Sequence, residues 1–313
     1  MMVFAVAGGT GGVGKTIVNQ LELSKGHTVF VLSRTVPENQ TPNDTRFIKV
    51  DYNDTTSLTR CLEENEVEAV VSTINLQDEA AGNAQLSLIE AADTSKTTKR
   101  FIPSQFAFTN SPGGMDDDPT VRYAIKSVDA LRKSSLEFTG FANGFFMDYW
   151  GMPHIPSNLW AYTWAIDIAN KRAAIPGTGD DVLSLTYSVD VAKFVARTLE
   201  SSDKWPETSI VSGSDMTFNQ LLAIAEKIRG CKFDTKYDSL ESLEKNEGTL
   251  LQVGYGGGGG ASEDEAKQMV SLFGRMTISG AFRLPDENRI NDKFPGLQPM
   301  TAEELLTMAW AGK

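Results

Sequence analysis

Five glycines fall within seven residues near the start of the chain, in the segment Gly8-Gly9-Thr10-Gly11-Gly12-Val13-Gly14. The glycines at positions 8, 11 and 14 have the spacing of a dinucleotide-binding turn, whose backbone bends tightly and approaches a pyrophosphate at the start of a helix. The same segment, with Lys15 and Thr16, also satisfies the Walker A pattern, which supplies a lysine for the β- and γ-phosphates and a hydroxyl for magnesium. Two kinds of phosphate-binding site are therefore open at this turn.

The residues at the end of the next apolar segment distinguish the two motifs. Ser33-Arg34 follow Gly14 by about 20 residues, where dinucleotide-binding folds place the residue that contacts the adenosine ribose. A small hydroxyl followed by arginine suits the 2′-phosphate of NADP, whereas an acid at this position is typical of NAD sites. Asp51 fits either motif, as a magnesium ligand of a P-loop enzyme or as an acid near the adenine. We therefore expect NADP(H) at this turn, with a P-loop ATPase as the remote alternative.

These residues need a sheet that brings several strand ends together, and the hydrophobic pattern predicts one. Short apolar runs predict strands at 3–7, 28–32, 47–50 and 67–74, with a fifth strand beginning at residue 101. Helical segments, 78–92 among them, separate these runs. Such alternation predicts right-handed βαβ units and a doubly wound parallel α/β sheet of the Rossmann type.

The pattern changes after about residue 145. A strand-like run covers 183–187, and an amphipathic helix is predicted over 189–202. We expect a Rossmann domain over 1–150 and a smaller, interwoven substrate-binding region over 151–313, with about 180–202 returning to the Rossmann domain. Three capping boxes predict helix starts, Thr217 with Gln220, Ser262 with Glu265 and Thr301 with Glu304, and the glycine run 256–260 predicts a loop.

Composition narrows the classes of partner and the compartment. A net charge of −12 repels phosphate backbones, which argues against nucleic-acid binding. The two cysteines are far apart and the two histidines cannot make a His-rich site, so neither a disulfide framework nor a bound metal is expected. No apolar run approaches the roughly 18 residues of a membrane helix, and the expected compartment is the cytosol. The oligomeric state stays open, with a homodimer as one option.

Several motifs downstream of the glycine turn carry a family resemblance. Asp51-Tyr52, Phe101-Ile102-Pro103-Ser104-Gln105-Phe106, Lys126, Leu136-Glu137-Phe138-Thr139, Asn143-Gly144-Phe145-Phe146 and Thr186-Tyr187-Ser188-Val189-Asp190-Val191-Ala192 occur in this order. In that order and spacing, the chain resembles the NmrA-like family. These are atypical short-chain dehydrogenases that include the isoflavone reductase and phenylcoumaran benzylic ether reductase group.

The resemblance implies a catalytic role for Lys126, because the isoflavone reductase-like enzymes use a lysine after the fifth strand as general acid/base beside the nicotinamide. Pro103-Ser104-Gln105-Phe106 corresponds to a Pro-Ser-Glu-Phe segment of the family, with glutamine in place of glutamate. Ordinary short-chain dehydrogenases place a tyrosine four residues before the lysine, but here Tyr123 precedes Lys126 by three. Tyr123 is thus the weaker catalytic candidate, with a packed aromatic as its alternative role and a solvated helix lysine as the alternative for Lys126.

Seven aromatic residues lie between Phe145 and Trp164, within a stretch of 20 residues. Such a cluster suits the wall or lid of a pocket for a flat, apolar, aromatic substrate, and equally suits a core or a subunit interface. His154 lies in this stretch and could donate a proton to a bound substrate. The predicted substrate-binding residues are Phe106, Asn143, Phe145, Phe146, Tyr149, Trp150 and His154.

Together these patterns predict an NADPH-dependent reductase of a small, apolar, aromatic or polyketide-like secondary metabolite, which reduces a C=O, C=C or C=N bond. The alternative is an NADP(H)-binding redox sensor of NmrA type without turnover, favoured by the spacing of Tyr123 and by Gln105. The predicted cofactor-binding residues are Gly8, Thr10, Gly11, Gly12, Val13, Gly14, Ser33, Arg34, Asp51, Thr73, Pro103, Gln105 and Lys126.

Overall fold

The computed structural model describes residues 2–24, 26–36, 46–107, 119–251 and 262–313. The chain divides into two compact units: unit 1 is Met1–Ala142 with Ala192–Ser209, and unit 2 is Asn143–Val191 with Ile210–Lys313. The sequence pattern places the domain boundary near residue 150, with a return at about 180–202. The glycine run 256–260 lies outside the described residues.

Unit 1 is built on a six-stranded parallel sheet with the strand order β3-β2-β1-β4-β5-β7. The strands are β1 (Met2–Ala7), β2 (His27–Ser33), β3 (Arg46–Lys49), β4 (Ala69–Ser72), β5 (Arg100–Ile102) and β7 (Glu137–Phe138). Phe4 to Ala7 are buried because helices cover both faces of the sheet, which explains the continuous apolar run in the sequence. The predicted doubly wound parallel fold is confirmed.

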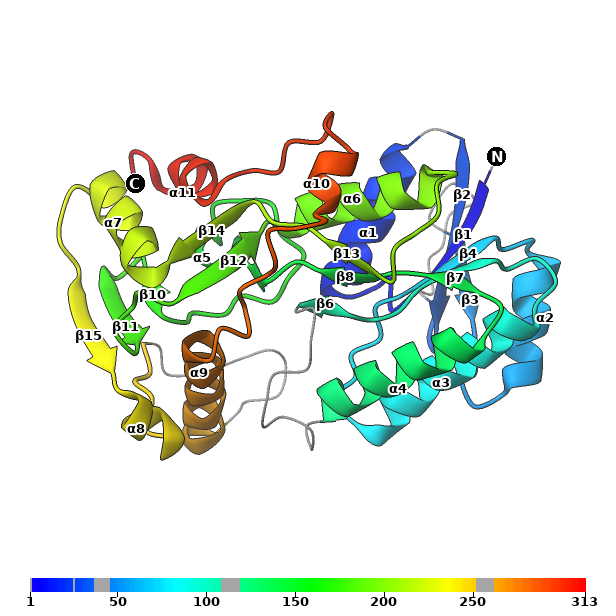
Figure 1. Ribbon diagram of the computed structural model, residues 1–313, viewed down its shortest axis with the longest axis horizontal. Coiled ribbons are helices and arrows are strands. Elements are labelled where there is room, and N and C mark those ends of the chain that lie inside the picture. The colour runs from blue at the N-terminus through cyan, green and yellow to red at the C-terminus, as the bar shows by residue number, and fades with distance from the viewer. Residues whose placement is uncertain (1, 25, 37–45, 108–118, 252–261) are drawn as a thin grey trace. The chain divides into compact units, whose positions relative to one another are not determined.

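Five helices accompany this sheet: α1 (Gly12–Leu23), α2 (Thr55–Glu64), α3 (Glu79–Thr94), α4 (Pro119–Lys133) and, from Ala192 onward, α6 (Ser188–Glu200). Figure 1 shows α2, α3 and α4 along one face of the sheet and α1 with α6 on the other. Side-chain caps set the starts of two of them, since Asp54 accepts from the Ser57 N–H at 2.9 Å and Asp78 from the Ala81 N–H at 2.7 Å. A short sheet of order β13-β8-β6 contains β6 (Phe106–Ala107), β8 (Gly140–Ala142) and β13 (Thr208–Ile210).

Unit 2 contains two three-stranded sheets, of order β14-β12-β9 and β10-β11-β15. Its strands are β9 (Phe145–Phe146), β10 (Ile166–Asp167), β11 (Arg172–Pro176), β12 (Val182–Thr186), β14 (Ser214–Thr217) and β15 (Asp234–Asp238). Its helices are α5 (Asp148–Gly151), α7 (Phe218–Arg229), α8 (Leu240–Glu244), α9 (Glu263–Ile278), α10 (Ile290–Lys293) and α11 (Ala302–Trp310). All three predicted capping boxes are present, at the starts of α7, α9 and α11.

No helix within the described part of the chain has the length and apolarity that crossing a bilayer requires.

Candidate functional site

The carboxyl ends of the unit 1 strands bring the predicted phosphate- and ribose-binding residues to one edge of the sheet. Ala7 at the end of β1 pairs with Leu32 of β2 and with Ser72 of β4, and Ser33 pairs with Lys49 of β3. Parallel strands in this register end side by side, and ligands of open α/β sheets bind at that edge. The residues that follow the strands there are Gly8, Arg34, Asp51, Thr73 and Pro103.

The glycine turn joins β1 to α1 through a bend of a few residues. Gly8 has a φ of +78°, and its carbonyl accepts from the Gly11 N–H at 3.2 Å. Gly11 is the N-cap of α1, which begins at Gly12, and no side chain caps the first turn. The first N–H groups of the helix, with the positive end of its dipole, form a site suited to a pyrophosphate.

The lack of a side chain matters at two positions of this turn for different reasons. A Cβ on Gly14 would lie 2.3 Å from the Thr73 Oγ1 and 2.4 Å from the Gly8 carbonyl oxygen, so the turn itself requires glycine there. A Cβ on Gly11 would have the Gly8 carbonyl oxygen at 4.0 Å as its nearest neighbour, so the protein leaves open space at that position. Open space beside an uncapped helix start fits the close approach of a dinucleotide backbone, and the residues present fit the cofactor.

This difference gives a prediction for two valine variants. Gly11→Val should fold normally, because the backbone there is extended and the space is open, but should weaken NADPH binding by ~10–100-fold through an overpacking cost of about 1–3 kcal/mol. Gly14→Val should lower the melting temperature because the added atoms meet Thr73 and Gly8. Calorimetric titration and thermal unfolding measure the two effects. An unchanged NADPH affinity in Gly11→Val would contradict this placement of the pyrophosphate.

The structure disfavours the Walker A interpretation of the same turn. The Thr16 side chain is 4% exposed, and its hydroxyl donates to the Gly12 carbonyl at 2.9 Å within the helix. A P-loop enzyme uses this hydroxyl to bind magnesium, so it would have to leave the helix backbone first. Lys15 is exposed on α1. The dinucleotide interpretation needs neither side chain.

The end of β2 presents Arg34 at the sheet edge. Arg34 is exposed and follows Ser33, whose Oγ accepts from the Thr35 N–H at 3.3 Å. Tyr52 lies behind it and donates its hydroxyl to the Leu32 carbonyl at 3.1 Å. Burial raises the pKa of Tyr52 above its ordinary value, and the positive charge of Arg34 opposes part of that shift. Because Arg34 is exposed at the end of β2, its guanidinium can extend over this edge of the sheet and bind a 2′-phosphate there.

Asp51 begins the turn between β3 and α2. Its Oδ1 accepts from the Asn53 N–H at 2.9 Å and from the Asn53 side-chain amide at 3.0 Å. The carboxylate is exposed and closes this turn locally. Thr73, after β4, holds the glycine turn from the other side: its N–H and its hydroxyl both donate to the Ala7 carbonyl at 2.8 Å.

Lys126 and Tyr123 are neighbours on α4 but differ in exposure. Lys126 is exposed, and its Nζ lies 4.8 Å from the centroid of the Tyr123 ring. The Tyr123 ring is 3% exposed and packs against α3, where a Cβ on Gly82 would come within 2.2 Å of it. This geometry fits the alternative role of Tyr123 as a packed aromatic, and it leaves the Lys126 side chain accessible, as both of its predicted roles require.

The segment after β5 is held firmly against its surroundings. Pro103 is buried, and its carbonyl accepts from the Gln105 N–H at 2.8 Å. The Gln105 side chain occupies the space that a Cβ on Gly140 would need, with its Oε1 at 2.3 Å from that position. Phe106 stacks on Phe141 with ring centroids 6.2 Å apart, so this predicted substrate residue belongs to unit 1.

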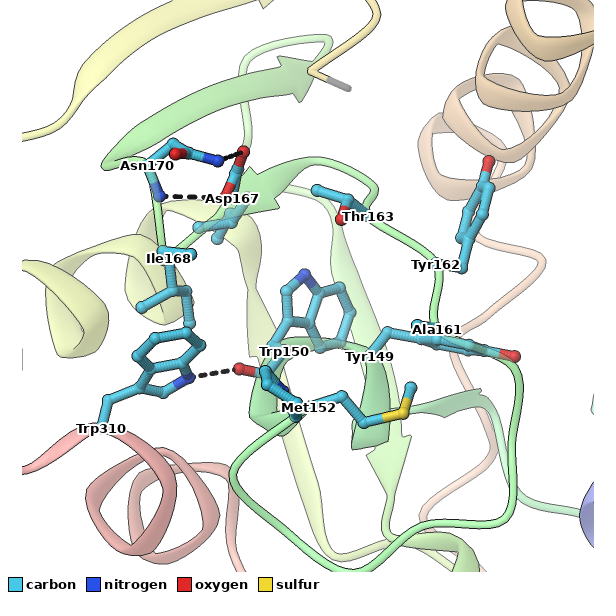
Figure 2. A pocket seen from close by; sticks show the side chains of 13 residues that line it. Tyr149, Trp150, Met152, Ala161, Tyr162, Thr163, Asp167, Ile168, Asn170 and Trp310 are labelled. Atoms are coloured by element: carbon cyan, nitrogen blue, oxygen red, sulfur yellow. Dashed lines mark hydrogen bonds between the residues drawn. The ribbon is translucent and has the colours of Figure 1, made fainter. Parts of the chain in front are cut away.

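Unit 2 contains a cavity of about 310 Å³ with aromatic walls (Figure 2). The lining residues are Tyr149, Trp150, Met152, Pro153, Ala161, Tyr162, Thr163, Ile166, Asp167, Ile168, Ala169, Asn170 and Trp310. Both indole N–H groups are already used, since Trp150 donates to the Trp164 carbonyl at 3.0 Å and Trp310 to the Trp150 carbonyl at 2.7 Å. These two side chains therefore present ring surfaces to the cavity rather than hydrogen-bond donors.

Asp148 holds the short helix that carries Tyr149 and Trp150. One carboxylate oxygen accepts from the Ser188 N–H at 2.9 Å, and the other accepts from the Ser157 hydroxyl at 2.7 Å. Burial raises the pKa of Asp148, and these hydrogen bonds oppose part of the shift. On the polar side of the cavity, Asp167 accepts from the Asn170 N–H at 3.0 Å and its side-chain amide at 2.8 Å, so its carboxylate closes the β10–β11 turn.

The remaining predicted substrate residues of unit 2 take different positions. Phe145 is 7% exposed and packs among core aromatics, with Trp164 at 4.9 Å between ring centroids. Asn143 is fully buried, Phe146 is half-buried, and neither lines the cavity. His154 is exposed and meets Trp310 edge-on at 4.6 Å. The aromatic stretch therefore supplies both core and cavity wall.

Trp310 lines the cavity but is not singled out by the sequence, whereas Tyr162 belongs to the aromatic stretch that the sequence predicts as a pocket wall. The capping box at Thr301 predicts the helix that carries Trp310. No local pattern shows that this helix packs against a segment 160 residues away.

The fold and the sheet-edge residues define a Rossmann-type dinucleotide-binding protein. A family model described as the NmrA-like family matches residues 2–256, and the chain belongs to the NmrA-like family. The predicted family is thus confirmed.

Fungal relatives extend the match beyond the family model. The oxidoreductase swnN of Metarhizium robertsii is 30% identical over 346 residues, covering 100% of this chain and 98% of the relative. The oxidoreductase BOA1 of Botryotinia fuckeliana is 34% identical over 243 residues, covering 77% of this chain and 81% of the relative. Both relatives are named as oxidoreductases, so the predicted class of enzyme is confirmed at that level.

Among solved structures, the chain is similar to one described as AtPrR2 with NADP+ and (+)pinoresinol. The TM-score is 0.72, the identity is 20%, and 98% of each chain is covered. This similarity shows the fold over nearly the whole chain.

Proposed function

We propose that this protein is an NADPH-dependent reductase that acts on a small, largely apolar, aromatic or polyketide-like metabolite. The observation that carries the proposal is the uncapped start of α1, with open space at Gly11, on the same sheet edge as Arg34. The oxidoreductase names of the relatives and the NADP+ bound in the AtPrR2 structure support it.

Different residues of the sheet edge bind different parts of the cofactor. The N–H groups at the start of α1 bind the pyrophosphate, and Arg34 with Ser33 binds the 2′-phosphate. When bound, NADPH supplies the hydride for reduction. Lys126 holds or moves the proton that the reduced group needs, directly through its Nζ or through a water that it orients.

The unit 2 cavity supports the substrate class. Its volume of about 310 Å³ lies at the lower end of ligand pockets, which span roughly 300–1,000 Å³. Its walls offer the ring faces of Trp150 and Trp310, while the carboxylate of Asp167 is occupied by its own turn. A flat, neutral and mainly apolar molecule fits these walls best.

Oxidation of NADPH with a panel of aromatic ketones, enones and imines tests the proposed function. We expect steady absorbance loss with at least one member and tight NADPH binding without substrate. Tight binding with no turnover across the panel would favour the redox sensor, for which the burial of Tyr123 is the supporting observation. Magnesium-dependent ATP binding without NADPH binding would favour the P-loop ATPase.

Filling the cavity should separate substrate binding from cofactor binding. Ala161 is exposed and lines the cavity, so Ala161→Trp can be accommodated without disturbing the core. We expect a KM for the substrate raised by ~10-fold or more, since the indole removes contact area worth about 1.5 kcal/mol or more, and an unchanged Kd for NADPH. Ala80→Trp, on the exposed side of α3, is the control. Steady-state kinetics showing equal KM values in both variants would place the substrate elsewhere.

A further inference from the structure

A fully buried amide lies at the interface of α3 and α4. Gln85 is 0% exposed. It is buried on α3 together with the apolar residues Leu88 and Ile89. Burying an unpaired amide costs several kcal/mol by hydrocarbon-transfer measures, so a buried glutamine needs partners for both ends. Gln85 has both.

The two ends of the Gln85 amide join segments that are distant in sequence. Its Oε1 accepts from the Ser104 N–H at 2.9 Å, in the segment after β5. Its Nε2 donates to the Ser127 Oγ at 2.7 Å, and that hydroxyl donates in turn to the Tyr123 carbonyl at 2.7 Å. One side chain thus ties the loop at the sheet edge to the backbone of α4.

These hydrogen bonds fix the part of α4 that carries Lys126. Ser127 follows it directly, and Tyr123, one turn earlier, carries the ring over which the Lys126 Nζ lies at 4.8 Å. The Tyr123 ring in turn packs on Gly82 of α3, one turn before Gln85. A long, exposed lysine keeps a fixed place only if the helix beneath it is fixed, and a misplacement of about 1 Å can cost 10²-fold in rate.

We propose that Gln85 is the positioning residue for Lys126: its buried amide fixes α4 relative to the loop at Ser104, and so holds the Nζ beside the bound nicotinamide. The inference rests on the proposed function, because it takes Lys126 to lie at the cofactor. It assigns no chemical step to Gln85, whose amide is fully buried and hydrogen-bonded to Ser104 and Ser127. Its effect is exerted through Ser127 and Tyr123.

The variant Gln85→Leu removes both hydrogen bonds at similar volume. Ser127→Ala removes only the tie to α4 and leaves the bond to Ser104, so it serves as a milder second variant if Gln85→Leu folds poorly. Thr98→Val is the matched control, because Thr98 is a buried polar residue of unit 1 whose hydroxyl donates to the Val67 carbonyl at 2.9 Å, away from α4.

The test measures the reaction of Lys126 with acetic anhydride, by mass spectrometry, with and without NADPH. In the wild type and in Thr98→Val, we expect NADPH to slow acetylation of Lys126 by ~10-fold or more, because the bound cofactor covers the amine. In Gln85→Leu and Ser127→Ala this protection should be lost while the Kd for NADPH is unchanged. With a substrate that turns over, kcat should fall by ~10–100-fold at unchanged KM for NADPH.

Two other outcomes overturn the inference in distinguishable ways. If NADPH slows the acetylation of Lys126 in Gln85→Leu as strongly as in the wild type, Gln85 does not position Lys126, and the proposed function stands. If NADPH binds the wild type but does not protect Lys126, the lysine is not at the cofactor. The proposed role of Lys126 then fails together with that of Gln85. Loss of protection in Thr98→Val as well would show a general loosening of unit 1 and would also overturn the assignment.

Discussion

Lys126→Met should lower kcat by ~10²–10⁴-fold while the Kd for NADPH stays unchanged. Lys126 is exposed, whereas the neighbouring Tyr123 ring is buried against α3, so Tyr123 is not available as a second proton-handling group. Methionine keeps the length and apolar stem of lysine and the helix propensity of α4. The loss should therefore appear in turnover, measured by NADPH oxidation at saturating substrate, and not in folding.

Two further variants of α4 make this prediction specific. Lys133→Met removes an exposed lysine from the last turn of the same helix and should leave kcat unchanged. Lys126→Arg keeps the charge but cannot give up a proton near neutral pH, so it should be nearly as impaired as Lys126→Met. Full activity in Lys126→Arg would show that the residue supplies only positive charge, and full activity in Lys126→Met would remove it from the mechanism.

Arg34→Ala should abolish the preference for NADPH over NADH. A charge-assisted hydrogen bond to the 2′-phosphate contributes about 1.5–3 kcal/mol, so the Kd for NADPH should rise by ~10–100-fold while that for NADH changes little. Because Arg34 is exposed, the wild-type preference should also decline as salt is added. Calorimetric titration with both cofactors measures each effect.

The control for Arg34 is Arg60→Ala, which removes an exposed arginine of α2 and should leave both affinities unchanged. An equal loss for NADPH and NADH in Arg34→Ala would mean that the guanidinium contacts a part shared by the two cofactors. Another residue would then bind the 2′-phosphate.

The parallel sheet and its strand ends could be predicted from the sequence because each depends on local patterns. The buried run at β1 and the glycines after it leave few conformations open. Parallel pairing then brings Arg34 to the same edge of the sheet as Gly8. The capping boxes were predictable for the same reason, since each is contained within four residues.

The parts that could not be predicted depend on packing between distant segments. Nothing local distinguishes Gln85 from an exposed helix glutamine, and only the approach of Ser104 and Ser127 makes its burial favourable. Trp310 becomes a cavity wall because its indole bonds to the carbonyl of Trp150. The spacing of Tyr123 and Lys126 left their roles open until the space at Gly82 showed which of them is packed.

A crystal structure with bound NADPH tests the central claim, that this chain holds NADP(H) at the glycine turn, most directly. We predict the pyrophosphate at the first N–H groups of α1, beside Gly11, and the 2′-phosphate within about 2.7–3.2 Å of the Arg34 guanidinium. The nicotinamide should lie on the side of Lys126. A pyrophosphate bound away from α1, or an adenosine ribose whose 2′-position lies out of reach of Arg34, would contradict the account.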